Sequence, residues 1–206
     1  MQPYERINLK QLRGKQREAG GKAFHEIEYR FEAGDRKRIS MTLFQRNISV
    51  EVFDEGENLR LVGRLDDTRL GAPLHSIEVE LLMTVWEGEI LEIKGSFPVR
   101  PMEECVEGLG SLQALVGAKI QPGFSELVQK NVNSRVGCSH LGALMMTIGN
   151  TSVQGRGGYM RKHMPDEKVA ATMLEFSERL NLLNSCVGWR EDGPLMKRWR
   201  ESQGQP

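Results

Sequence analysis

One change of hydrophobic periodicity, at Pro98, constrains the fold of this chain more than any other feature of its sequence. Before Pro98, apolar residues alternate with polar ones, as they do along half-buried strands. After it, apolar residues recur at the three- and four-residue intervals of amphipathic helices. Strands first and helices after predict an α+β fold, with helices packed on one face of an antiparallel sheet. The clearest strand face consists of Ile77, Val79, Leu81, Met83 and Val85.

The N-terminal half is predicted to be a meander of about five strands. Short turns rich in Gly, Asp, Glu and Asn favour antiparallel pairing of neighbouring strands. The segment from Gly71 to His75 is expected to be a loop that leads into the strongest strand. The predicted strands cover residues 25–31, 38–53, 59–65, 77–85 and 90–97.

The C-terminal half is predicted to hold several helices. Ser139 is a good N-cap type and is expected to begin the third of them. Gly155, Gly157 and Gly158 are expected to break the chain after that helix, giving a mobile loop over the site. The apolar stripes run over residues 109–116, 127–132, 141–148 and 169–183.

Composition and charge limit the classes of protein to which this chain could belong. The 206 residues carry 28 basic and 28 acidic side chains, so net charge gives no bias towards nucleic acid or an anionic membrane. Residues 1–22 are predicted to be a basic tail or irregular lead-in, and residues 23–200 a single α+β domain. Neither a membrane span nor a signal peptide is evident, so a cytoplasmic location is expected, with the three cysteines as free thiols.

The stretch Gly-Cys-Ser-His-Leu, residues 137–141, carries the most chemistry of any short segment. A helix N-terminus stabilises a cysteine thiolate, and it disfavours the protonated form of a nearby histidine. Cys138 and His140 would meet only if the backbone bends between them, because side chains two apart do not share a helix face. An isolated Cys-x-His is more often inert packing than a site.

Further motifs resemble those of a known family. They are Leu65-Asp66-Asp67-Thr68, Pro73-Leu74-His75, Cys105 within residues 101–106, Leu115-Val116-Gly117 through Gly123-Phe124, Gly137-Cys138-Ser139-His140-Leu141, and Cys186 with Trp189-Arg190 and Asp192-Gly193-Pro194. From about Leu59 to Trp199, their order and spacing resemble the bacterial proteins grouped as domain of unknown function 2889 (DUF2889). The family often has Asp where this chain has Ser76, which removes a possible partner for His75, and Thr where it has Ser139.

The resemblance implies which residues hold family positions, but it implies no reaction. Five soft or borderline metal ligands fall on the motifs, whereas the remaining histidines, His25 and His163, do not. We therefore expect a site centred on Cys138 and His140 and completed by three more side chains, with both residues acting on a shared ligand rather than on each other. The five residues are His75, Cys105, Cys138, His140 and Cys186.

Three functions fit these residues. The first is a small-molecule enzyme with a Cys/His metal site, all five residues being candidate ligands for zinc or iron, that activates water or a carbonyl. The second is a metal-free enzyme on an organic acid or thioester, with Cys138 as nucleophile or His75 and His140 as acid and base. In that case Asp66, Asp67 or Glu104 would orient a histidine.

The third function is non-catalytic: a ligand-binding protein or an accessory subunit that docks on a larger enzyme, or a homo-oligomer. Ten methionines and basic chain ends would suit a partner surface. Neither nucleic acid nor a membrane is an expected partner, because basic and aromatic residues are not interleaved as nucleic-acid binders require.

Overall fold

The computed structural model describes residues 15–19, 22–26, 42–133, 135 and 137–202. The chain divides into two compact units, Met1–Ser40 and Met41–Pro206. In the first unit, strands β1 (Lys15–Ala19) and β2 (Lys22–Glu26) pair antiparallel. Strand β1 therefore lies within the stretch for which an irregular lead-in is predicted.

The predicted strand at residues 25–31 lies mostly outside the described residues. The domain bounds of residues 23–200 stay a prediction.

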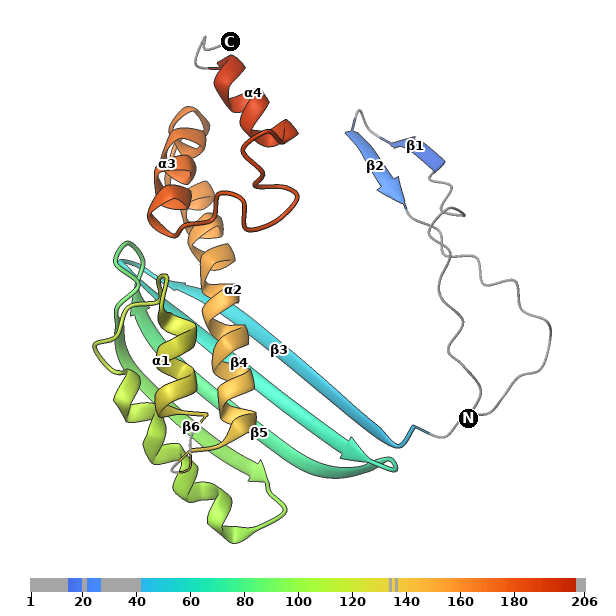
Figure 1. The fold of residues 1–206 in the computed structure, drawn as a ribbon, viewed down its shortest axis with the longest axis vertical. Helices are drawn as coiled ribbons and strands as arrows, with labels where there is room; N and C mark the ends of the chain where they lie inside the picture. The colour runs from blue at the N-terminus through green and yellow to red at the C-terminus, as the bar shows by residue number, and fades with distance from the viewer. Residues whose placement is uncertain (1–14, 20–21, 27–41, 134, 136, 203–206) are drawn as a thin grey trace, which may run out of the picture. The chain divides into compact units, whose positions relative to one another are not determined.

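The second unit is built on a four-stranded antiparallel meander, in the order β3-β4-β5-β6 (Figure 1). Helices follow in the chain and pack against this sheet, which confirms the α+β prediction. The strands are β3 (Phe44–Glu55), β4 (Asn58–Arg69), β5 (Ala72–Thr84) and β6 (Ile90–Val99).

The hairpin between β4 and β5 corrects the predicted loop at Gly71–His75. Leu70 and Gly71 both have positive φ, 51° and 80°, as a two-residue hairpin turn requires. Strand β5 therefore begins at Ala72. A register shift next to Asp67 leaves Leu74 without a partner on β4, so the pairs are Thr68 with Pro73 and Asp67 with His75.

Among the described residues, five helical segments follow the sheet: the 3₁₀ helix η2 (Glu103–Leu115), α1 (Phe124–Asn131), α2 (Ser139–His163), α3 (Asp166–Arg179) and α4 (Pro194–Ser202). Helix α2 is the longest, and it lies across β3 and β4 (Figure 1). None of the helices in the described part of the chain combines the length and apolar character needed to cross a membrane.

The glycine-rich break and mobile loop predicted at residues 155–158 are wrong, because α2 continues through them to His163. A Cβ on Gly155 would lie 2.6 Å from Val52 Cγ1 of β3, and one on Gly149 would lie 2.8 Å from Phe124 Cε1 of α1. Glycine thus lets the helix approach its neighbours closely. Packing offsets the helix-propensity cost of about 1 kcal/mol per glycine.

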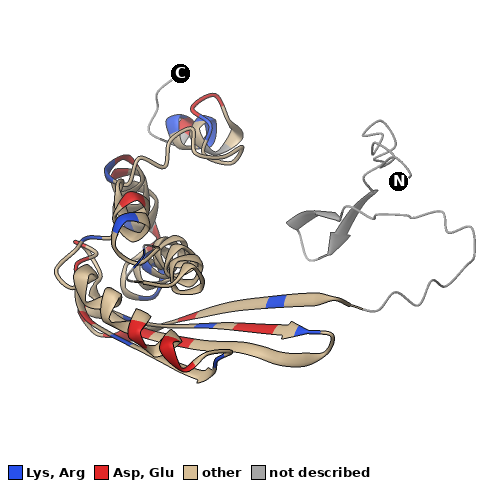
Figure 2. Cartoon of the chain, turned by 60° about the horizontal axis from the view of Figure 1, so that its bottom comes forward, with Lys and Arg blue, Asp and Glu red and all other residues tan. Residues whose placement is uncertain are grey.

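The core lies between the sheet and the helices. Leu61, Leu65 and Ile77 of the strands meet Leu144 and Ile148 of α2, all fully buried or nearly so. On the other face of the sheet, opposite charges pair across strands, as in Arg64 with Glu78 at 2.9 Å. Both signs of charge occur on strands and helices alike (Figure 2). The fold thus fixes one buried face of the sheet, and the candidate site lies on that face.

Candidate metal centre

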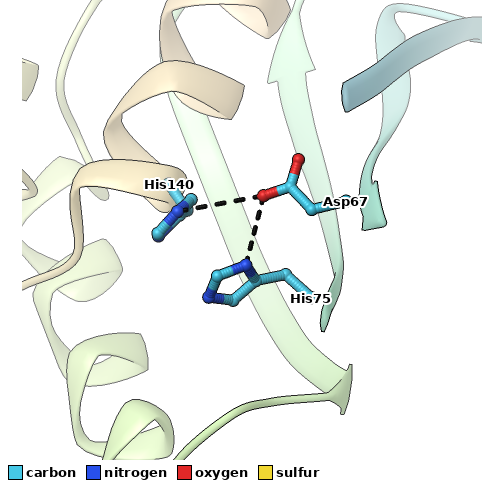
Figure 3. A group of neighbouring side chains, drawn as sticks. All are labelled: Asp67, His75 and His140. Carbon is cyan, nitrogen blue, oxygen red and sulfur yellow. Dashed lines mark hydrogen bonds and ion pairs between the residues drawn. The ribbon is translucent and has the colours of Figure 1, made fainter. Parts of the chain in front are cut away.

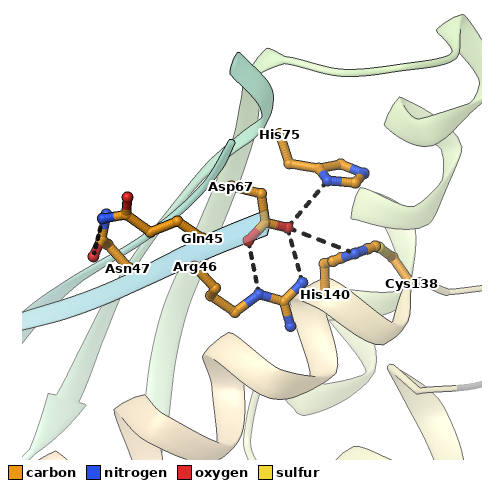
Figure 4. A network of polar contacts seen from close by, with 7 residues as sticks. All are labelled: Gln45, Arg46, Asn47, Asp67, His75, Cys138 and His140. Atoms are coloured by element: carbon orange, nitrogen blue, oxygen red, sulfur yellow. Dashed lines mark hydrogen bonds and ion pairs between the residues drawn. The ribbon is translucent and has the colours of Figure 1, made fainter. Parts of the chain in front are cut away.

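Three polar side chains continue the buried face of the sheet on three neighbouring strands. Asp67 has the same parity along β4 as Leu61 and Leu65, and His75 has the same parity along β5 as Ile77. Arg46 pairs with Asp67 across β3 and β4, and Asp67 pairs with His75 across β4 and β5. The sheet register therefore places all three side chains in one row (Figure 4).

The N-terminus of α2 brings the fourth residue, His140, to this row. Gly137 is required there because a Cβ would lie 1.9 Å from the carbonyl oxygen of Val132. Cys138 follows in extended conformation (φ −144°, ψ 129°) and is the N-cap residue, so the predicted N-cap, Ser139, is instead the first helical residue. His140 thus lies in the first turn, over the end of β4 (Figure 3).

Asp67 is the hub of the contacts, and its side chain is 0% exposed. Arg46 Nε donates to Oδ1 and Nη2 donates to Oδ2, each at 2.8 Å. His75 Nδ1 lies 3.1 Å from Oδ2, and His140 Nε2 lies 3.9 Å from the same oxygen (Figure 3). The two imidazole rings stack with centroids 4.1 Å apart and a tilt of 35°.

The protonation states follow from these contacts. The hydrogen bonds from Arg46 lower the pKa of Asp67, outweighing its burial, and raise the pKa of Arg46. Burial, together with the charges of His75 and Arg46, lowers the pKa of His140 although Asp67 acts the other way. At neutral pH the group therefore presents a carboxylate and a neutral His140 imidazole, the forms that bind metal ions.

Asp67, His75 and His140 form a group that could hold a metal ion. One ligand atom from each lies within 4.8 Å of the others. Ligand atoms bound at about 2.0–2.2 Å are themselves about 2.8–3.6 Å apart when their bonds meet at about 90–109°. The 3.1 Å and 3.9 Å separations from Asp67 Oδ2 are close to that range. Side-chain adjustments of less than about 1 Å would close the set around an ion.

The three cysteines predicted as ligands lie at different places relative to this group. Cys138 Sγ lies 3.6 Å from His140 Nδ1, because the extended backbone at Cys138 provides the bend that direct contact needs. The condition set for their meeting, a bend of the backbone between them, is therefore met, and that both residues act on a shared ligand stays a prediction. Cys105 packs half-buried against the main core, and Cys186 is exposed between α3 and α4. None of the three belongs to the Asp67/His75/His140 group.

Two residues of the site, Asp67 and Arg46, are not singled out by the sequence analysis. Asp67 is predicted only as one of three carboxylates that could orient a histidine, and Arg46 is not predicted at all. The available signal is parity: Arg46 continues the series Ile48, Val50 and Val52, which packs against the core. His163, which has no motif position, bonds Asp54 at 2.6 Å at the far end of α2.

The fold and the site define an α+β protein in which a buried carboxylate and two partly buried histidines, from the sheet and from α2, form a group that could hold a metal ion. The chain belongs to a family of proteins of unknown function, DUF2889, whose model matches residues 44–154. The match confirms the family, but it spans a different range from the predicted Leu59 to Trp199: it begins earlier and contains Arg46, and it ends before Cys186. Asp67, His75 and His140 lie within it. The comparisons with curated proteins and with solved structures gave no match.

Proposed function

We propose that Asp67, His75 and His140 bind a divalent metal ion and that the protein is a metal-dependent enzyme acting on a small molecule. The observation that carries this proposal is the convergence of three ligand atoms within 4.8 Å around a buried carboxylate. Two imidazoles and a carboxylate leave coordination positions open for water or substrate. A metal ion there would activate a water molecule or polarise a carbonyl.

Zinc and iron are the ions this ligand set favours. Two histidines and one carboxylate bind zinc in hydrolytic sites, and the same set binds iron in oxygen-dependent enzymes. The absence of a thiolate from the group removes the strongest preference for zinc. Metal analysis of protein purified without a histidine tag, followed by titration of the metal-free protein with each ion, distinguishes the two.

Single substitutions test the ligand assignment. We expect about one metal ion per chain in the wild type, and loss of at least tenfold in affinity in His75→Ala and His140→Ala, as removal of a ligand predicts. His163→Ala is the matched control, because His163 is also partnered by a carboxylate but lies outside the group. A wild-type protein that binds neither ion at micromolar concentration would overturn the proposal.

A second candidate function rests on the contact between Cys138 and His140. Cys138 Sγ is 3.6 Å from His140 Nδ1, and His140 Nε2 is 3.9 Å from Asp67 Oδ2. A nucleophile, a base and an orienting carboxylate follow one another in that order in cysteine-dependent acyl transfer. In this alternative the neutral His140 accepts the thiol proton, and Cys138 Sγ attacks the carbonyl carbon of a thioester without a metal ion. The C–S bond of the substrate then breaks, the departing thiolate takes the proton from His140, and the acyl group stays on Cys138.

Alkylation rates separate the two candidates. Iodoacetamide labelling of Cys138 below pH 7 should exceed that of the exposed Cys186 in the same molecule if His140 activates the thiol. His140→Ala should remove this excess. Equal or slower labelling of Cys138 argues against the nucleophile. Cys138→Ser would abolish metal-free catalysis but leave metal stoichiometry unchanged, whereas His140→Ala would impair both functions.

A further inference from the structure

Arg46 uses only some of the N–H donors of its guanidinium group to bind Asp67. The two hydrogen bonds to Asp67 use one N–H of Nε and one of Nη2. A guanidinium carries five N–H donors, so three remain, including the pair on Nη1 and Nη2 that can bind a second carboxylate in parallel. The Arg46 side chain is 34% exposed, which leaves it accessible to a ligand.

The charges of the site show what that ligand would be. Asp67 is the carboxylate that pairs with Arg46 and faces both histidines within the described part of the chain, with contacts of 2.8 Å to Arg46, 3.1 Å to His75 and 3.9 Å to His140. Its single negative charge is already matched by Arg46. A divalent ion bound beside this pair would therefore leave the site with two excess positive charges next to a buried group, and an anionic ligand would compensate them.

The surroundings of Arg46 favour an organic anion over an inorganic one. Phe44, which lies on the same face of β3, places its ring 5.7 Å from the guanidinium carbon and is 49% exposed. Phe44 thus offers an exposed apolar surface beside Arg46, which an apolar ligand body could cover.

We propose that Arg46 is a specificity-determining residue that binds the carboxylate of an organic acid substrate at the metal centre, with the substrate's apolar part against the exposed ring of Phe44. This inference rests on the proposed metal-dependent function. It goes beyond that function in naming the substrate class and in giving Arg46 opposite effects on the two ligands. Arg46 attracts the anion, and it opposes the cation by neutralising and occupying Asp67.

Isothermal titration of the full chain tests these opposite effects. In zinc-loaded protein, Arg46→Gln should weaken the binding of benzoate by about 10- to 100-fold, as loss of a hydrogen bond to a charged group predicts. In metal-free protein, the same change should tighten the binding of zinc. Arg64→Gln is the control, because Arg64 pairs with Glu78 on the other face of the sheet, and both affinities should stay at wild-type values.

A second variant and a comparison of three anions separate the possible outcomes of this experiment. Arg46→Lys retains the charge but not the paired N–H donors, so its affinity for benzoate should lie between those of the wild type and Arg46→Gln. If the glutamine variant folds poorly, Arg46→Lys alone is compared with the wild type. Benzoate should bind more tightly than acetate or phosphate, and tighter binding of phosphate would overturn the carboxylate assignment. Unchanged benzoate binding in both Arg46 variants, or weakened zinc binding in Arg46→Gln, would overturn the role of Arg46. Failure of the wild type to bind zinc or iron would instead overturn the proposed function.

Discussion

Replacement of Asp67 by asparagine tests whether the ion pair beneath the site stabilises the fold. The carboxylate is 0% exposed and accepts two hydrogen bonds of 2.8 Å from Arg46, with His75 Nδ1 at 3.1 Å. Removing one partner of a buried ion pair costs about 3–5 kcal/mol. Arg46 is 34% exposed and can regain water, so we expect a smaller loss, about 2–3 kcal/mol.

Urea denaturation in the presence of a chelator measures this loss without a contribution from bound metal. A loss of that size should lower the unfolding midpoint by about 1 M, given the slopes usual for chains of this length. Glu78→Gln is the matched control, because its ion pair with Arg64 is exposed on both sides and is worth about 0–1 kcal/mol. If Asp67→Asn costs no more than Glu78→Gln, the ion pair does not stabilise the fold.

The dependence of this effect on pH gives a second check. Arg46 lowers the pKa of Asp67, so the folded state holds this carboxyl charged at pH values where the unfolded chain, with a pKa of about 3.9, begins to protonate it. The stabilisation is therefore present above about pH 4 and is lost as pH falls through the folded-state pKa. The difference between wild type and Asp67→Asn should shrink below pH 4. A constant difference down to pH 3 would refute the reasoning.

The remaining predictions concern helix α2 and the histidines. Gly155→Ala should destabilise the protein by about 1–3 kcal/mol because its Cβ would lie 2.6 Å from Val52 Cγ1, whereas Gly158→Ala, with open space around it, should stabilise by about 0.4–1 kcal/mol in the same urea assay. NMR titration should place the pKa of His140 below 6.5 because the imidazole is partly buried, and a higher pKa would contradict this reasoning. The free energy of unfolding should accordingly fall as pH falls through about 6.5, where the unfolded chain takes up the proton first. Zinc should raise the melting temperature of the wild type but not that of His75→Ala, as a scan with and without chelator would show.

The sequence predicts the class of fold well because hydrophobic period is a local property. The alternation in residues 77–85 and the helical spacing from Val169 onward both report which face is buried. The extent of α2 is not predictable in this way. Its glycines lower the local preference for helix, and only contact with Val52 and Phe124, remote in the chain, accounts for them.

The candidate site is partly predictable for the same reason. His75 and His140 lie together, as predicted, and Cys138 contacts His140 but lies outside the metal group. The two histidines could be chosen because their chemistry is rare in this chain and their motifs lie near the starts of regular elements. The carboxylate could not be chosen among Asp66, Asp67 and Glu104 from composition. The choice depends on strand register and on the bulge at Leu74, which together set Asp67 opposite His75.

Every second residue of a strand faces the same side of the sheet, and this alternation continues past the last apolar residue of the core into the site. Along β4 the buried series continues to Asp67, along β5 it continues to His75, and along β3 the core-packed series continues to Arg46. Antiparallel pairing in register brings these three ends together, so a carboxylate that would be costly alone is placed between two partners. The metal group therefore rests on the rigid sheet, and His140, held at the start of α2 by the close approach at Gly137, completes it. Affinity for an ion should accordingly depend on the sheet register as much as on the ligands themselves. Deleting Ser76, which separates His75 from the core residue Ile77, should abolish metal binding by pairing His75 with Asp66 and turning it to the opposite face.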